Sequence, residues 1–152
     1  QVHNNFCLAK KTTIFLLWFF FMKKEFLTNK NLLSEVHAWV KECLIQQATE
    51  DQFLTIIIVV NEIIQNIYRY TYHLEKDQPI NIAIKYNGLL QFEVRDYGTP
   101  CHDQSFLDAE PEISETGGMG LKIIVENTVS FKIQPLDNGN VTSFAFNLSK
   151  TS

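Results

Sequence analysis

Glu62 and Asn66 stand four residues apart in a stretch that is otherwise rich in isoleucine and valine. A separation of four residues places both side chains on one face of a helix. A carboxylate and an amide that project from a mostly buried helix need polar partners. An amide oxygen can bind Mg²⁺ beside phosphates, and a carboxylate one turn away can activate a hydroxyl group or water. The simpler alternative is a solvated outer face, because Thr55, Gln65 and Arg69 extend the same polar stripe.

Two other short motifs contain residues that suit a nucleotide. Asp96-Tyr97-Gly98 follows an alternating stretch, and an aspartate there can accept a hydrogen bond from an exocyclic amine such as that of adenine. Gly98 would let a flat ring approach the backbone. The run Gly117-Gly118-Met119-Gly120 precedes a short apolar segment, and free N–H groups at a helix start suit phosphate. Each motif alone is also typical of a simple turn or hinge. Their fixed order and spacing make the nucleotide interpretation stronger.

A helix over residues 49–72 must position Glu62 and Asn66. Thr49 and Gln52 have the spacing of a capping box, and Glu50 and Asp51 follow at the positive end of the helix. The run Ile56–Val60, taken alone, would favour a buried strand. The length of the whole segment and its lack of glycine and proline favour the helix instead.

The other patterns predict an α+β protein, a two-layer sandwich with helices on one face of a mixed, mostly antiparallel sheet. The expected elements are a strand at 22–28, a helix from Asn29 or Asn31 to about Gln47, strands at 80–86 and 89–95 joined by Asn87-Gly88, a lid or binding loop at 99–116, a helix at 121–128, and strands at 130–135 and 141–148.

Composition limits the classes of function. The chain has 152 residues, of which 45% are hydrophobic and 20% charged, and its net charge is −4. These values fit one globular domain and give no indication of a nucleic-acid surface. Three widely spaced cysteines without a CxxC motif favour a reduced, cytoplasmic compartment, and the cysteine near the candidate site, Cys101, is interpreted as incidental.

Residues 1–21 differ from the rest of the chain. They contain no acidic residue, and the apolar run that begins at Thr13 is too short to span a bilayer. We therefore expect an upstream or expression-derived extension, or a short hydrophobic segment, followed by one domain at 22–152. No contact with a membrane is expected.

Four stretches together resemble the GHKL ATPase superfamily, and within it the anti-sigma factor serine/threonine kinases of the RsbW and SpoIIAB type. NEIIQNIYRYTY is similar to their N-box, VRDYGTP to their D-x-G box, GGMGLKII to their second glycine box and DNGNVTSFAFNL to their last strands. The resemblance implies a Bergerat-type fold. It also implies ATP and Mg²⁺ as cofactors, with Glu62 as catalytic base and Asn66 as Mg²⁺ ligand. It also implies nucleotide contacts by Arg69, Asp96, Gly98, Gly117, Gly118, Met119, Gly120, Leu121, Lys122 and Thr142.

The chain departs from the family pattern in three respects. After Asp96-Tyr97-Gly98 it has Thr99-Pro100 where the family has a second glycine. Ile67 and Tyr70 stand where the N-box usually has alanine and histidine. The segment from Tyr97 to Leu121 contains no lysine or arginine but five acidic residues, Asp103, Asp108, Glu110, Glu112 and Glu115. A lid that closes over a triphosphate normally brings positive charge. Compensation would therefore have to come from Mg²⁺, the helix start, Lys122 and Arg69.

Two functions follow as hypotheses from the resemblance. The first is a protein kinase that phosphorylates an anti-sigma antagonist of the STAS type in a partner-switching pathway of transcription regulation. The second is a nucleotide-loaded switch that sequesters a sigma factor or another partner with little or no transfer. A sensor histidine kinase fits less well, because no helix pair with a phospho-accepting histidine precedes the domain. The family also implies a homodimer.

Overall fold

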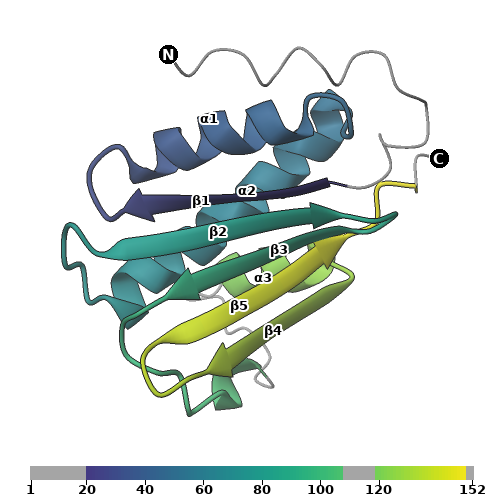
Figure 1. Ribbon diagram of the computed structural model, residues 1–152. Helices are drawn as coiled ribbons and strands as arrows, with labels where there is room; N and C mark the ends of the chain where they lie inside the picture. The colour runs from purple at the N-terminus through teal and green to yellow at the C-terminus, as the bar shows by residue number, and fades with distance from the viewer. Residues whose placement is uncertain (1–19, 108–118, 150–152) are drawn as a thin grey trace, which may run out of the picture.

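The computed structural model describes residues 20–107 and 119–149, in which five strands form one sheet and three α-helices cover one of its faces (Figure 1). The elements are β1 (Phe20–Leu27), α1 (Leu32–Leu44), α2 (Glu50–Asn66), the π-helix η2 (Ile67–Thr71), β2 (Pro79–Tyr86), β3 (Leu90–Asp96), the short 3₁₀ helix η3 (Ser105–Leu107), α3 (Met119–Asn127), β4 (Ser130–Pro135) and β5 (Asn140–Phe146). The expected two-layer α+β sandwich is confirmed.

The sheet has the strand order β1-β2-β3-β5-β4. The sequence predicted a mixed sheet, but every pairing among the described strands is antiparallel. Two hairpins, β2-β3 and β4-β5, account for two of the four pairings, and β1 and β5 each pair antiparallel with a hairpin strand. The sheet therefore needs no parallel crossover.

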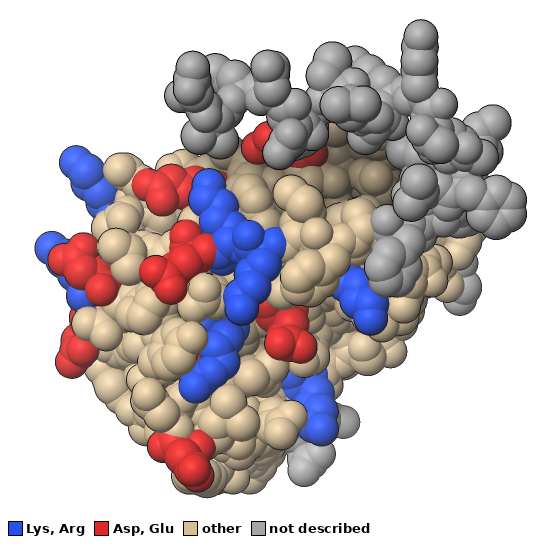
Figure 2. All heavy atoms as spheres, in the orientation of Figure 1, with Lys and Arg blue, Asp and Glu red and all other residues tan. Residues whose placement is uncertain are grey.

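Alternation along the strands decides which residues face the helices. On β3, Leu90, Phe92 and Val94 are buried at every second position, and Asp96 continues the same series. The register pairs Asp96 with Asn140 of β5. Because side chains two apart share a face, both polar residues lie on the core side of the sheet. The opposite face carries many of the charged side chains (Figure 2).

The helix α2 contributes most to the core. Its predicted capping box is present, with the Thr49 hydroxyl accepting from the Gln52 N–H at 3.2 Å and the Gln52 side chain accepting from the Thr49 N–H at 2.9 Å. The strand alternative for residues 56–60 is wrong, because helical spacing leaves Ile58 49% exposed while its neighbours are buried. The buried stripe consists of Phe53, Ile56, Ile57, Val59, Val60, Ile63 and Ile64.

The predicted first helix is confirmed with shorter bounds, since it ends at Leu44 instead of about Gln47. Asn31 is its N-cap, but it makes no side-chain cap hydrogen bond. The Asn29 side chain accepts from the Asn31 N–H at 2.8 Å and orders the preceding turn.

Across the sheet, the rings of Phe92 and Phe144 stack at 5.0 Å between centroids.

A π-helix continues α2 and fixes its end to the end of β3. The carbonyl oxygen of Thr71 accepts from the Thr99 N–H at 3.0 Å, and a side chain at Gly98 would collide with that carbonyl. The buried Tyr72 hydroxyl accepts from the Tyr97 N–H at 2.8 Å and donates to the Pro79 carbonyl. π-helices are rare and often mark functional sites. Here the element brings α2 against the turn that follows Asp96.

None of the helices in the described ranges has the length and hydropathy that a membrane span requires.

The strand β1 begins at Phe20, whose ring stacks on Tyr86 at 6.0 Å. The described strand therefore starts before the predicted domain boundary at Met22. The boundary itself stays a prediction, and the residues before Phe20 lie outside the described part of the chain.

The first prediction concerns Tyr72. We expect Tyr72→Phe to lower the free energy of unfolding by about 1–3 kcal/mol, because it leaves the Tyr97 N–H and the Pro79 carbonyl without their buried partner. Tyr86→Phe is the matched control. Its hydroxyl has no hydrogen bond within the described residues, so a change under about 0.5 kcal/mol is expected. Urea denaturation of both variants measures the difference, and equal losses would contradict the assigned role.

The second prediction tests the domain boundary. A chain that starts at Met22 should fold, because the core cluster draws its strand residues from Phe26 onward and from β2, β3 and β5. It should be less stable than a chain that starts at Phe20 by up to about 1 kcal/mol, the usual contribution of a cross-strand aromatic pair. Thermal denaturation compares the two. Failure of the shorter chain to fold would place the boundary further upstream.

Candidate functional site

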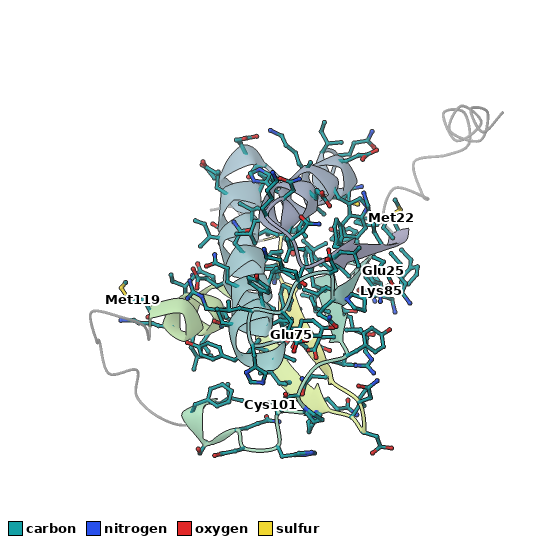
Figure 3. All side chains as sticks on the ribbon, turned by 90° about the vertical axis from the view of Figure 1, so that its left-hand side faces the viewer. Met22, Glu25, Glu75, Lys85, Cys101 and Met119 are labelled. Atoms are coloured by element: carbon teal, nitrogen blue, oxygen red, sulfur yellow. The ribbon has the colours of Figure 1, made fainter. Side chains whose placement is uncertain are left out.

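A cavity of about 900 Å³ lies between the helix layer and the end of the sheet where β3 stops and β5 begins. It is lined by residues of α2, η2, α3, β3, β4 and β5 and of the loop after β3. Figure 3 shows two of the lining residues, Met119 at the start of α3 and Cys101 on that loop. Much of the wall is apolar, with contributions from Ile63, Ile67, Ile123, Ile124, Phe131 and Ile133.

Glu62 and Asn66 both line this cavity, and their four-residue spacing places them on the same face of α2. Both side chains are partly exposed. The Glu62 carboxylate lies so close to Gly120 that a Cβ atom on Gly120 would collide with Oε2. A larger residue at position 120 would require the Glu62 side chain to move. The carboxylate and the start of α3 are thus in close contact in the cavity wall.

Asp96 also lines the cavity and is only 1% exposed. Its Oδ1 accepts from the Gly98 N–H at 3.2 Å and from Asn140 Nδ2 at 3.1 Å, and its Oδ2 lies 3.3 Å from the same Nδ2. Burial raises the pKa of Asp96 above its ordinary value, and these hydrogen bonds offset part of that rise. The result is a strong acceptor at the base of an apolar cavity.

Asn140 belongs to the site but was not singled out from the sequence. Its amide group donates to Asp96 and, at 3.0 Å, to the Thr99 carbonyl, while its oxygen accepts from the Cys101 N–H at 2.7 Å. The sequence placed it in the turn before a strand starting at residue 141, whereas β5 starts at Asn140. Asn140 and Thr142 are two residues apart and therefore share one face of the strand. Since Thr142 was already a predicted site residue, and it lines the cavity and is buried, this spacing could have indicated Asn140.

The two predicted cations differ in position. Arg69 lines the cavity, and its Nη2 lies 3.4 Å from the Gln65 side-chain oxygen. Lys122 is not among the lining residues, because it lies on the exposed side of α3 and pairs with Glu126 at 3.7 Å. Among the described lining residues, Arg69 is therefore the single cation.

The glycine box and the lid are described only in part. Met119, Gly120 and Leu121 line the cavity, whereas Gly117 and Gly118 lie outside the described residues. Gly98 is not in the lining, but its N–H holds Asp96. Of the predicted lid at 99–116, residues up to Leu107 are described, and two of them, Cys101 and Phe106, form cavity wall. The lid acids from Asp108 to Glu115 lie outside the described residues.

The lining residues can be examined for two chemical roles, metal binding and nucleophilic catalysis by cysteine. No group of three or more His, Cys, Asp or Glu side chains in the described ranges could hold a metal. Asn66 offers one oxygen ligand, which suits a Mg²⁺ ion that keeps several waters and binds beside phosphates. Burial raises the pKa of the Cys101 thiol, and the nearby Asp103 carboxylate adds to that rise. Cys101 is thus a neutral wall residue at pH 7 and not a nucleophile.

Comparisons with known proteins address the family. Residues 26–146 match the model of the histidine kinase-like ATPase domain. A search of curated protein sequences found no match. Among solved structures, the RsbU and RsbW domains of Rv1364c from Mycobacterium tuberculosis align with a TM-score of 0.61 and 16% identity, over 84% of this chain and 32% of that one.

A second structure, the histidine kinase domain from the Erythrobacter litoralis EL346 blue-light activated histidine kinase, aligns with a TM-score of 0.54 and 13% identity, over 79% of this chain and 61% of that one. The chain thus spans less than two thirds of either structure, and identities this low establish only a shared fold. The family model covers most of the sequence, including the first three motifs in full and the fourth up to Phe146. The chain belongs to the family of histidine kinase-like ATPase domains.

Proposed function

We propose that the chain binds ATP with Mg²⁺ in this cavity and transfers the γ-phosphate to a serine of a partner protein, as an anti-sigma factor kinase does. The observation that carries the proposal is that two sets of polar groups line one cavity. One is the buried acceptor Asp96, and the other consists of Glu62, Asn66 and the first turn of α3. The apolar part of the wall suits a purine and its ribose.

The Asp96 carboxylate supports adenine as the base that binds beside it. An ionised carboxylate only accepts hydrogen bonds, so it pairs with the exocyclic amine of a 6-aminopurine. Gly98 and Asn140 already hold Oδ1, and Oδ2 has only one long contact, at 3.3 Å, with a described residue. Thr142, the next core-facing residue of β5, adds a hydroxyl group to the same wall.

The start of α3, with Glu62 and Asn66, suits the phosphates. Met119 and Gly120 open α3, and N–H groups at a helix start attract anions. Asn66 would hold Mg²⁺, the ion that neutralises charge developing on the phosphates. Glu62 lies next to Gly120 and would act as general base toward the hydroxyl group of the partner's serine.

The partner is proposed to be a STAS-type antagonist of an anti-sigma factor, a sigma factor, or both, with the chain acting as a homodimer. The support is the motif resemblance together with the fold shared with a protein whose title names an RsbW domain. A nucleotide-loaded switch without transfer is the second candidate. Its support is the single cation, Arg69, among the described lining residues.

The third prediction tests the adenine end. Asp96→Asn places an amide beside the two donors that now hold the carboxylate. A mismatch of buried polar groups costs about 1–3 kcal/mol, which corresponds to a roughly tenfold to hundredfold loss of ADP affinity. Asp137→Asn, in the exposed turn before β5, is the control and should bind as the wild type does. Calorimetry measures both, and unchanged affinity in Asp96→Asn would remove Asp96 from the site.

Acidification provides a second readout of Asp96. Protonation removes the negative acceptor, so wild-type affinity should fall as the pH decreases through the Asp96 pKa. Because burial raises that pKa, the fall should begin above the pH at which an exposed aspartate is protonated. Asp96→Asn should lack this dependence, and a wild-type profile in the variant would assign the titration to another group.

The fourth prediction tests transfer. Glu62→Gln keeps the shape of the side chain but removes the base, so phosphate incorporation into a small antagonist protein should fall by about 10²–10⁴-fold. ADP binding should survive. Glu93→Gln, on the face of the sheet away from the cavity, is the control. Asn66→Ala should in addition weaken the Mg²⁺-dependent part of nucleotide affinity.

Two outcomes of that assay would change the proposal. Equal incorporation by the wild type and by Glu62→Gln would exclude Glu62 as the base. No incorporation by the wild type with any partner, together with firm ATP binding, would favour the switch over the kinase.

A further inference from the structure

We propose that Asn140 is a positioning residue that couples the carboxylate of Asp96 to the loop at residues 99–107, so that the purine-reading group and one wall of the cavity are ordered as a unit. The consequence for ligand binding rests on the proposed nucleotide site. The coupling itself is a property of the ligand-free protein and can be tested there.

The first step is the saturation of the Asn140 amide. The residue is 2% exposed, and both of its polar atoms have partners. Nδ2 donates to Asp96 Oδ1 at 3.1 Å and to the Thr99 carbonyl at 3.0 Å, while Oδ1 accepts from the Cys101 N–H at 2.7 Å. A flipped amide would set oxygen against the Asp96 carboxylate and NH₂ against the Cys101 N–H. Only one orientation satisfies all partners.

The second step extends from Asn140 through the loop to the edge of the sheet. The Gln104 side chain donates to the Cys101 carbonyl at 3.3 Å and to the Ile133 carbonyl of the edge strand β4 at 3.0 Å. Asp96, Asn140, Cys101, Gln104 and β4 are therefore joined by consecutive hydrogen bonds. Since Cys101 and Phe106 form cavity wall, the same chain of bonds fixes the wall.

The third step concerns the charge of Asp96. The ionisable side chain that acts on the pKa of Asp96 is Arg95, whose guanidinium contacts the Asp96 carbonyl and lowers that pKa. The Asp96 carboxylate in turn helps to raise the pKa of the Tyr72 hydroxyl and that of the Cys101 thiol. From α2 and η2, Glu62 and Arg69 line the same cavity. The neighbours on β5, Asn140 and Thr142, are uncharged. Within the described residues, Asn140 is the one side chain that donates a hydrogen bond to the Asp96 carboxylate.

The experiment compares Asn140→Leu, Asn140→Thr and the control Asn138→Ala in the neighbouring turn. Carboxyl ¹³C NMR measures the pKa of Asp96, and amide hydrogen exchange measures the opening of the Cys101 N–H, both without ligand. In Asn140→Leu the pKa of Asp96 should rise by about one to two units, the shift expected when a hydrogen bond to a charged group is lost. Exchange at Cys101 should become faster by about tenfold.

Asn140→Thr separates the hydrogen bond to Asp96 from the hydrogen bond to the Cys101 N–H. Its hydroxyl can still donate to Asp96 but is too short to bridge to the Cys101 N–H as well. We expect a pKa of Asp96 near the wild-type value together with fast exchange at Cys101. A merely structural residue would change stability in both variants without separating these readouts. Asn138→Ala should leave both at wild-type values.

ADP titration over a range of pH then links the coupling to the proposed function. ADP affinity is expected to decrease as the pH decreases. In Asn140→Leu this decrease should occur at a higher pH than in the wild type, by the same amount as the pKa of Asp96 rises. An unchanged Asp96 pKa and unchanged Cys101 exchange in a folded variant would overturn the proposal. If Asn140→Leu does not fold, Asn140→Thr decides, because wild-type exchange at Cys101 would overturn it equally. If the wild type does not bind ADP, the proposed function fails while both ligand-free readouts still decide the coupling.

Discussion

The buried carboxylate of Asp96 is the constraint on which the site depends. It occupies a core-facing position of β3, where the preceding members of the series are Leu90, Phe92 and Val94. A charge in such a place is costly unless donors compensate it. The Gly98 N–H and Asn140 supply those donors, and they fix the turn after β3 and the start of β5. The buried carboxylate is thereby kept as a hydrogen-bond acceptor in the wall of an apolar cavity.

One helix serves both the core and the site. The stripe from Phe53 to Ile64 packs against the sheet, while Glu62 and Asn66 reach the cavity from the flank of α2 that faces α3. Because the core holds α2 along its length, these two groups lie on a rigid element, which favours precise placement of reacting groups. The closing turn in η2 then fixes the helix end against Gly98.

The charge of the cavity distinguishes this chain from a simple phosphate site. Arg69 is the one cation among the described lining residues, and Lys122 is paired with Glu126 on the outer side of α3. Neutralisation of a triphosphate would therefore depend on the start of α3 and on Mg²⁺ held at Asn66. For the function proposed above, this charge balance would decide between phosphoryl transfer and simple nucleotide binding.

The sequence by itself determined the elements and much of the site. Alternation gave β2 and β3, helical spacing and the Thr49 capping box gave α2, and the four-residue separation of Glu62 and Asn66 put both on one cavity. These features are local, because they depend only on the period of each element. The tertiary structure alone decided the antiparallel order of the strands, the pairing of Asp96 with Asn140, the contact between Glu62 and Gly120, and the position of Lys122 outside the cavity. Each of these joins, or separates, residues of different elements, and such distances are set by packing and register, which no local period encodes.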